Sequence, residues 1–447
     1  LGVRVPLSPP IRLALSSNNF AGYRDFNLIN IPHLAAMKYR DYSFTWGANA
    51  LGGASTWTFL IASQWFVLEK SDKSAMVGLF TFASMLPFLL ASPIGGLLAD
   101  RIERKKLTFI TIIGGLATII IAAILSITDV LQLWHLSVLA FISGCCRTTQ
   151  ESSITALVTN IVDRKDLMNA ITLNAATRHG SRAIGMAFLL LARFGNADFA
   201  NTSYFLILSA LFAVGAALFI SLVKKESIGE INSTGSPFSG MAEGMKYIYT
   251  NRAVAIFIIL VAFHCALVMS FDSILPAFTR DILGSSNESL LALLVLSFGV
   301  GSAIGTFLMA GITSDKNKGL MLVLTAFVSG LAPIALGFSY NSLFAFGSCI
   351  VMGGSQSIFM SLTATYVQLV APDRLRGRVT SLYILHAGGI MAFANLGYGY
   401  LSDQFGAPEI LVTTGVIFIV IFLALRVSDP ILKSISRGGT SFIQQTA

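Results

Sequence analysis

Charged residues are scarce in this sequence of 447 residues. Asp, Glu, Lys and Arg make up 12% of it, whereas hydrophobic residues make up 54%. Soluble domains carry about 25% charged residues, so this shortage argues against a soluble fold and makes lipid the expected surroundings. Apolar windows long enough for a helix to cross a bilayer occur twelve times, at 44–68, 76–99, 107–128, 133–159, 167–191, 203–223, 253–278, 289–311, 319–339, 342–370, 378–401 and 409–426.

These apolar windows are continuous and do not alternate with polar residues. Alternation is the pattern of a transmembrane β-barrel strand, whereas a continuous run is the pattern of a membrane-spanning helix. The sequence therefore predicts an all-α membrane protein with twelve transmembrane helices.

The motifs of enzymes and ATP-driven pumps are also missing. The sequence has no G-x-x-x-x-G-K-[ST] loop, no serine elbow and no His/Cys spacing for a metal. Its four cysteines lie inside predicted spans, where we expect them to pack against neighbouring helices: Cys145, Cys146, Cys265 and Cys349. We therefore expect no enzyme activity, no cofactor and no metal.

The net charge of +8 would suit a nucleic-acid partner, but the positions of the charges argue against one. If the loop at 96–106 faces the cytoplasm, most Lys and Arg residues fall in cytoplasmic segments. The few that fall outside are Lys70, Lys73, Arg193 and Arg280. This is the asymmetry of the positive-inside rule, so the charge indicates topology, with both termini in the cytoplasm.

A long polar interruption at 224–252 divides the spans into two sets of six. The pattern Gly96-x-x-x-Asp100-Arg101 ends the second span, and Gly311-x-x-x-Asp315-Lys316 ends the eighth. We predict two pseudo-symmetric six-helix bundles with a substrate site between them near the membrane midplane. The predicted organisation is a cytoplasmic tail at 1–42, bundles at 43–223 and 253–428, a cytoplasmic linker at 224–252 and a cytoplasmic tail at 429–447.

The loop that begins at Gly96 also resembles the signature loop of the major facilitator superfamily. Its pattern is Gly-x-x-x-Asp-Arg-x-x-Arg-Lys, with Glu103 where a glycine is usual. Four more stretches resemble one branch of the superfamily, the transmembrane secretion effectors, which include enterobactin-type siderophore exporters and macrolide efflux pumps. They lie at 33–44, 146–150, 166–174 and 375–379.

This resemblance implies alternating access in a bacterial inner membrane. It also implies a latch between the cytoplasmic ends of the bundles, formed by the signature loop and a weaker second copy. The residues carried over are Gly96, Asp100, Arg101 and Arg104, with Asp315 and Lys316 in the second copy. The Gly-Pro pair typical of antiporters in span five is absent, because Met186 follows Gly185.

Several charged residues lie inside the predicted spans, where an unpaired charge costs at least about 2.5–3.5 kcal/mol at the bilayer centre. Arg147 and Glu151 are one helical turn apart, and Arg178 is at a similar depth on the next span, so the three can cluster. Arg182 lies one turn deeper. The surplus of arginine suits an anionic substrate; the alternative is an ion-pair network that only joins spans four and five.

Glu151 is the first candidate for carrying a proton, since a carboxylate in a changing environment can shift its pKa into the working range. Asp272 is the second, although it lies near the outer end of its span, where water can reach it. We also assign His264 to the central cavity, with a hydrogen-bonded structural histidine as the alternative.

Uncharged polar residues at helical spacing are the candidates for lining the substrate cavity, and helix packing is the alternative for each. They are Asn49, Thr56, Gln64, Gln356, Tyr383 and His386.

These observations together predict a monomeric secondary transporter that exports an amphipathic small molecule, a siderophore or a drug, in exchange for protons. Export follows from the resemblance alone. Two alternatives remain open at this point: a flippase for lysolipids or other lipids, and a membrane scaffold or sensor that does not transport.

Overall fold

The computed structural model describes residues 32–193, 202–225, 227, 237–286, 288–310, 312, 314–372 and 375–437. Within these ranges the regular structure is helical and no strand occurs. The first group of helices is η2 (Pro32–Lys38), α1 (Arg40–Ser71), α2 (Ser74–Leu90), α3 (Ser92–Arg101), α4 (Arg104–Ile127), α5 (Leu133–Ile161), α6 (Arg164–Arg193) and α7 (Thr202–Ser221). We call α1–α7 the N-terminal helices.

The second group begins with α8 (Pro237–Thr250), in the predicted linker. It continues with α9 (Arg252–Leu267), η3 (Ser270–Ser273), α10 (Leu275–Ala277), η4 (Phe278–Ile282), α11 (Ser289–Ala310), α12 (Asp315–Gly337), α13 (Ser342–Val370), α14 (Arg376–Phe405), α15 (Ala407–Ser428) and α16 (Pro430–Ile435). We call α9–α15 the C-terminal helices. Parts of the two predicted tails are helical: they form η2, the start of α1, and α16. The boundaries of the two bundles stay a prediction.

The all-α membrane fold is confirmed. In the part of the chain that the structure describes, eight helices are long and apolar enough to cross a membrane. Four further segments are more polar or broken: the long helices α1, α5 and α6, and the pair α2–α3. With these four the arrangement agrees with twelve spans, a count that stays a prediction.

Two of the predicted spans are not continuous helices. The span predicted at 76–99 is broken between Leu90 and Ser92, next to Pro93 at the start of α3. The span predicted at 253–278 ends as an α-helix at Leu267 and continues through the short helices η3 and α10. Pro276 affects only the later part of this irregular segment, because it has no N–H to bond the carbonyl of Asp272, four residues earlier.

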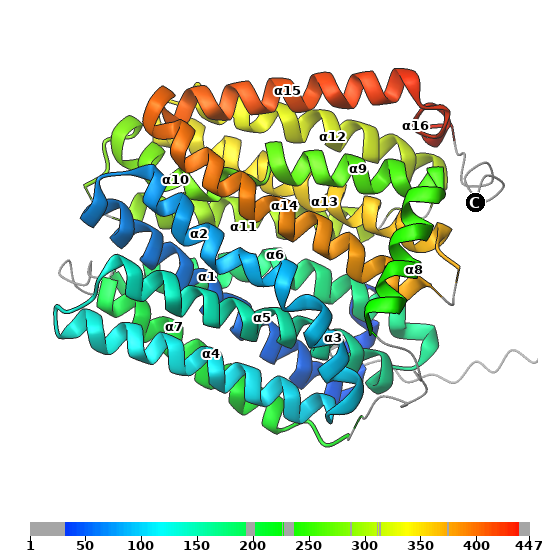
Figure 1. Ribbon diagram of the computed structural model, residues 1–447, viewed down its shortest axis with the longest axis horizontal. Helices are drawn as coiled ribbons and strands as arrows, with labels where there is room; N and C mark the ends of the chain where they lie inside the picture. The colour runs from blue at the N-terminus through cyan, green and yellow to red at the C-terminus, as the bar shows by residue number, and fades with distance from the viewer. Residues whose placement is uncertain are drawn as a thin grey trace, which may run out of the picture.

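The N-terminal and C-terminal helices meet along two helix pairs, α2 with α14 and α6 with α11. Figure 1 shows α2 and α14 side by side across the middle of the molecule. Glycines permit the close approach: a Cβ atom on Gly78 of α2 would lie 2.8 Å from the carbonyl oxygen of Asn395, and one on Gly299 of α11 would lie 2.6 Å from the backbone nitrogen of Ala183. Small residues at such positions are how membrane helices come close together.

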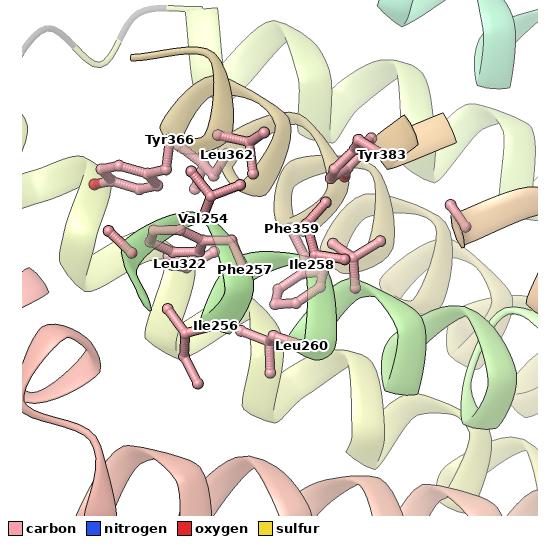
Figure 2. Packing of buried hydrophobic residues seen from close by; sticks show 14 of the residues in the cluster. Val254, Ile256, Phe257, Ile258, Leu260, Leu322, Phe359, Leu362, Tyr366 and Tyr383 are labelled. Carbon is pink, nitrogen blue, oxygen red and sulfur yellow. The ribbon is translucent and has the colours of Figure 1, made fainter. Parts of the chain in front are cut away.

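Apolar side chains fill the interior of the C-terminal helices and also cover the outside of the molecule. The largest buried cluster joins α9 and α13, where the rings of Phe257 and Tyr366 stack with centroids 5.2 Å apart (Figure 2). On the outside, Ile124 of α4, Leu211 of α7 and Val420 of α15 are more than half exposed. Such an apolar exterior fits lipid as the surrounding solvent.

Candidate functional site

The most deeply buried pair of charges joins the N-terminal helices to the C-terminal ones. The guanidinium of Arg182, on α6, donates from Nη1 to Oδ1 of Asp272 at 3.1 Å and from Nη2 to Oδ2 at 3.2 Å. Each side chain is 4% exposed. This bidentate geometry is the strongest form of carboxylate pairing.

Two aromatic rings enclose the guanidinium of Arg182. Its Cζ lies 3.4 Å from the ring centroid of Trp57, on α1, and 4.6 Å from that of Phe298, on α11. A planar guanidinium stacks well on aromatic faces and is attracted by their quadrupoles. The ion pair therefore lies at a junction of α1, α6, η3 and α11, away from bulk water.

The break before Pro276 positions the carboxylate of this pair. Asp272 lies in the one-turn helix η3, and the neighbouring Ser273 donates its backbone N–H to Oδ1 of Asn395 on α14 at 3.3 Å. The expectation that water reaches Asp272 is wrong, because the chain turns inward here and presents the carboxylate to Arg182.

A second, looser cluster contains the predicted proton carrier. Glu151 on α5 lies 3.6 Å from Nε of Arg147 and 3.6 Å from Nη2 of Arg178. Both separations are too long for hydrogen bonds, so these contacts are electrostatic. The Arg178 side chain is 45% exposed.

The structure brings Glu151, Arg147 and Arg178 together as the sequence predicts. Arg182 does not join them, because Asp272 takes up both of its terminal nitrogens. The result is two neighbouring charge groups, one neutral and closed, the other carrying a net positive charge and partly open.

Three of the predicted cavity residues have local packing contacts. Gln64 of α1 is buried and donates to Oγ1 of Thr81 on α2 at 3.0 Å, whereas Gln356 of α13 donates to the carbonyl of Val268 at 3.3 Å. The hydroxyl of Thr56 donates to the carbonyl of Gly52, one turn earlier. These contacts favour the packing alternative for all three.

The other predicted residues lie in different surroundings. Asn49 is half-buried on α1, and the Tyr383 hydroxyl donates to the carbonyl of Met360 at 3.1 Å. His386 lies where α8 meets α14, with Nε2 at 2.9 Å from the hydroxyl of Tyr249 and Nδ1 at 2.7 Å from the carbonyl of Leu382.

His264 has aromatic neighbours and does not contact either charge group. It is fully buried between Phe359 and Phe418, with ring centroids 4.3 Å and 5.2 Å away. Within the described residues neither of its ring nitrogens has a hydrogen-bond partner. The hydrogen-bonded alternative is therefore wrong for this histidine, and its surroundings are those of an aromatic core.

Comparisons with known proteins agree with this architecture. The family model described as transmembrane secretion effector matches residues 31–440. The chain belongs to the transmembrane secretion effector family. The resemblance stated from the sequence is thereby confirmed.

Relatives and solved structures show what other proteins of this kind do. Macrolide efflux protein A of Streptococcus pyogenes is 21% identical over 404 residues, covering 87% of this chain and 96% of its own. The staphyloferrin A transporter of Staphylococcus aureus is 22% identical over 380 residues, covering 84% of this chain and 93% of its own. The fold resembles that of the nucleoside transporter NupG with a TM-score of 0.67 at 13% identity, covering 86% of this chain and 99% of that one. This secretion effector is therefore a multi-pass membrane transporter.

Arg104 in the signature loop of this secretion effector bonds to α5 and to the segment after α7. Nη1 of Arg104 donates to the carbonyl of Ala156 on α5 at 2.9 Å and to Oγ of Ser227 at 3.3 Å. Arg101 is exposed, and a Cβ atom on Gly96 would meet no other atom within 4 Å. The side chain of Asp100 lies outside the described residues.

The second copy of the loop shows a local ion pair. Asp315, at the start of α12, lies 3.7 Å from Nζ of Lys318, and Lys316 is exposed; Gly311 lies outside the described residues. The latch between the two loops therefore stays a prediction.

Contacts between the two groups of helices gather instead at the opposite end of the secretion effector. Asp403, near the end of α14, accepts backbone N–H groups from Ser74 at 2.7 Å and Ala75 at 2.9 Å, where α2 begins. Arg280 in η4 pairs with Asp72 at 2.8 Å, and the hydrogen bond to its neighbour Asp281 raises the pKa of its guanidinium. Sequence reasoning missed these residues; the available signal was a carboxylate at the end of one span and a helix N-terminus at the same membrane level.

Proposed function

We propose that this protein exports an amphipathic small molecule with an anionic group, of the siderophore or drug class, in exchange for protons. The observation that carries the proposal is the buried Arg182–Asp272 pair between the two groups of helices. A carboxylate that can exchange its arginine partner for a proton converts proton binding into separation of these helices. The relatives named for macrolide efflux and for staphyloferrin A transport support the direction and the class of cargo.

The proposed cycle starts from the arrangement described here, which is closed at the end that holds Asp72, Asp403 and Arg280. Protonation of Asp272 leaves the guanidinium of Arg182 unneutralised between its aromatic rings. Removing one partner of a buried ion pair costs about 3–5 kcal/mol, which corresponds to more than a hundredfold change in a two-state equilibrium. The ion pair therefore favours the state that is closed at this end. In the proposed exchange, Asp272 takes up its proton while this end is open and releases it to the cytoplasm, where the pair with Arg182 forms again.

The looser cluster around Glu151 is the proposed binding place for the anionic part of the cargo. Arg147 and Arg178 carry two positive charges against one carboxylate, and Arg178 is the most exposed of the three. A guanidinium whose N–H groups are not all hydrogen-bonded can donate them to a carboxylate or phosphate of the cargo. Glu151 then competes with the cargo for the same arginines.

The proposed setting is a bacterial cytoplasmic membrane, with the protein as a monomer and both termini in the cytoplasm. The positive-inside distribution of Lys and Arg supports this orientation. In this proposed orientation the contacts of Asp403 and Arg280 lie on the outer side.

Transport assays in proteoliposomes test the proposal. Wild-type protein is expected to move a labelled macrolide or staphyloferrin A against its gradient when a pH gradient is imposed, whereas Asp272→Asn is expected to lose the dependence on the gradient. Asp129→Asn is the matched control, because Asp129 is an exposed carboxylate with a φ of 56° that asparagine tolerates. Flux that ignores the pH gradient in the wild type, or full coupling in Asp272→Asn, would contradict the proposal; flux of lysolipid alone would favour the flippase, and no flux of any cargo the scaffold.

A further inference from the structure

A second site lies away from the charge groups, at the end of the molecule that holds the signature loop. A cavity of about 330 Å³ opens between the start of α4 and the end of α7. Its lining residues are Glu103, Lys105, Lys106, Phe109, Ser221 and Lys224. This volume is at the lower end of the range for small-molecule sites, about 300–1,000 Å³.

The charge of this cavity suits an anion. Three lysines face one carboxylate, and among the described residues none of the three lysines forms an ion pair. The cavity also adjoins the first turn of α4, whose N-cap residue Glu103 makes no side-chain cap. The N–H of Arg104 already donates to the carbonyl of Ser227, and the positive end of the helix dipole adds to the potential of the lysines.

The surroundings of the cavity are apolar on the side that continues along the membrane. Phe109 and Ile113 on α4 are 39% and 40% exposed, and Leu218 and Leu222 on α7 are 61% and 47% exposed. Helices α4 and α7 pack against each other, and Figure 1 shows them together at one edge of the molecule. A basic cavity at a membrane surface that continues into an apolar wall matches a molecule with an anionic head and an acyl chain.

We infer that this cavity binds the phosphate of an anionic phospholipid, with the lysines around the head and the acyl chains along α4 and α7. A soluble phosphate compound would use the lysines but leave the apolar wall uncovered. The bound head would join the signature loop to the end of α7, beside the existing hydrogen bond from Arg104 N–H to the carbonyl of Ser227 at 2.8 Å. This site is separate from the proposed transport site.

Native mass spectrometry of the full chain in detergent, titrated with phosphatidylglycerol, tests the inference. Lys106→Gln/Lys224→Gln is expected to weaken binding of the first lipid about tenfold or more, since each lysine near an anionic surface contributes appreciably. The double variant Lys246→Gln/Lys433→Gln is the matched control, because it removes two exposed lysines of the same side from other helices, α8 and α16. Equal weakening in both variants, or in neither, would overturn the inference.

Two further arms separate the occupants and guard against misfolding. Glu103→Gln removes the opposing charge and is expected to tighten phosphatidylglycerol binding severalfold; unchanged or weaker binding counts against the site. Glycerol 3-phosphate is expected not to displace the lipid, and equal competition would identify a soluble phosphate as the occupant and overturn the lipid assignment. Melting temperatures in neutral phosphatidylcholine are expected to match the wild type for every variant.

Discussion

The carboxylate of Asp403 lies 2.7 Å from the backbone nitrogen of Ser74, so a side chain from α14 caps the start of α2. The cap joins residues that are 329 positions apart in the sequence. A carboxylate at a helix N-terminus binds the free N–H groups and the positive end of the helix dipole. In an alternating-access transporter, such a contact stabilises one state and must break in the other.

Asp403→Asn is therefore expected to shift the molecule toward opening at this end. The amide keeps one acceptor oxygen but loses the negative charge, and the loss of a helix-cap interaction costs about 0.5–2 kcal/mol. Spin labels on exposed Asp129 and Tyr340, in a background without the four native cysteines, report the separation of the two groups of helices by pulsed electron resonance. We expect a larger population of long distances in Asp403→Asn and no change in Glu69→Gln, which removes an exposed carboxylate near the end of α1. Identical distributions in all three proteins would show that the cap does not control opening.

Glycines beside this cap provide a second, purely steric prediction. A Cβ atom on Gly399 would lie 2.4 Å from the carbonyl oxygen of Ser74, whereas one on Gly397 of the same helix meets nothing within 4 Å. Gly399→Ala is expected to force α14 away from α2 and lower transport several-fold. Gly397→Ala is expected to leave transport unchanged and to stabilise the helix by up to about 1 kcal/mol. Equal transport rates for the two variants would contradict the close approach of these helices.

The Arg182–Asp272 pair predicts an unusual pattern of stability. Arg182→Gln and Asp272→Asn each leave one buried charge alone, at a cost of about 3–5 kcal/mol. The double variant leaves none, so its melting temperature in detergent is expected to lie above that of either single variant. Lys318→Gln is the control, because the side chains of its pair with Asp315 are 32% and 51% exposed and surface pairs contribute about 0–1 kcal/mol. Additive losses in the double variant would show that the two residues act independently.

The difference between the two charge groups shows how far sequence reasoning reaches in this protein. Arg147 and Glu151 are four residues apart on one helix, and the depth of Arg178 follows from counting residues along the next one. Counting residues along each of the two helices therefore predicted this cluster. Arg182 and Asp272 are 90 positions apart, and their pairing depends on where the chain leaves helical geometry before Pro276.

The same limit applies to the fold as a whole. The apolar windows predicted the helices, because a span needs a minimum length of apolar residues. They did not predict the breaks after Leu90 and Leu267, since an apolar run shows only that a span is long enough. The contact of Asp403 with Ser74 belongs to this second kind: the sequence placed both at span ends on one side, but did not show which two spans lie next to each other.

The cluster around Glu151 leads to a prediction that separates cargo binding from proton coupling. Glu151→Gln removes the carboxylate that pairs with Arg147 and Arg178, so an anionic cargo is expected to bind more tightly, with an apparent KM several-fold below that of the wild type. Arg178→Gln removes the most exposed arginine and is expected to raise the KM about tenfold, as expected for one charge-assisted contact of about 1.5–3 kcal/mol. Both variants are expected to keep the dependence on the pH gradient, because Asp272 is intact, and to leave the KM of a neutral cargo unchanged. The measurement is initial uptake into proteoliposomes over a range of cargo concentrations; loss of the gradient dependence in Glu151→Gln would instead assign the proton to Glu151.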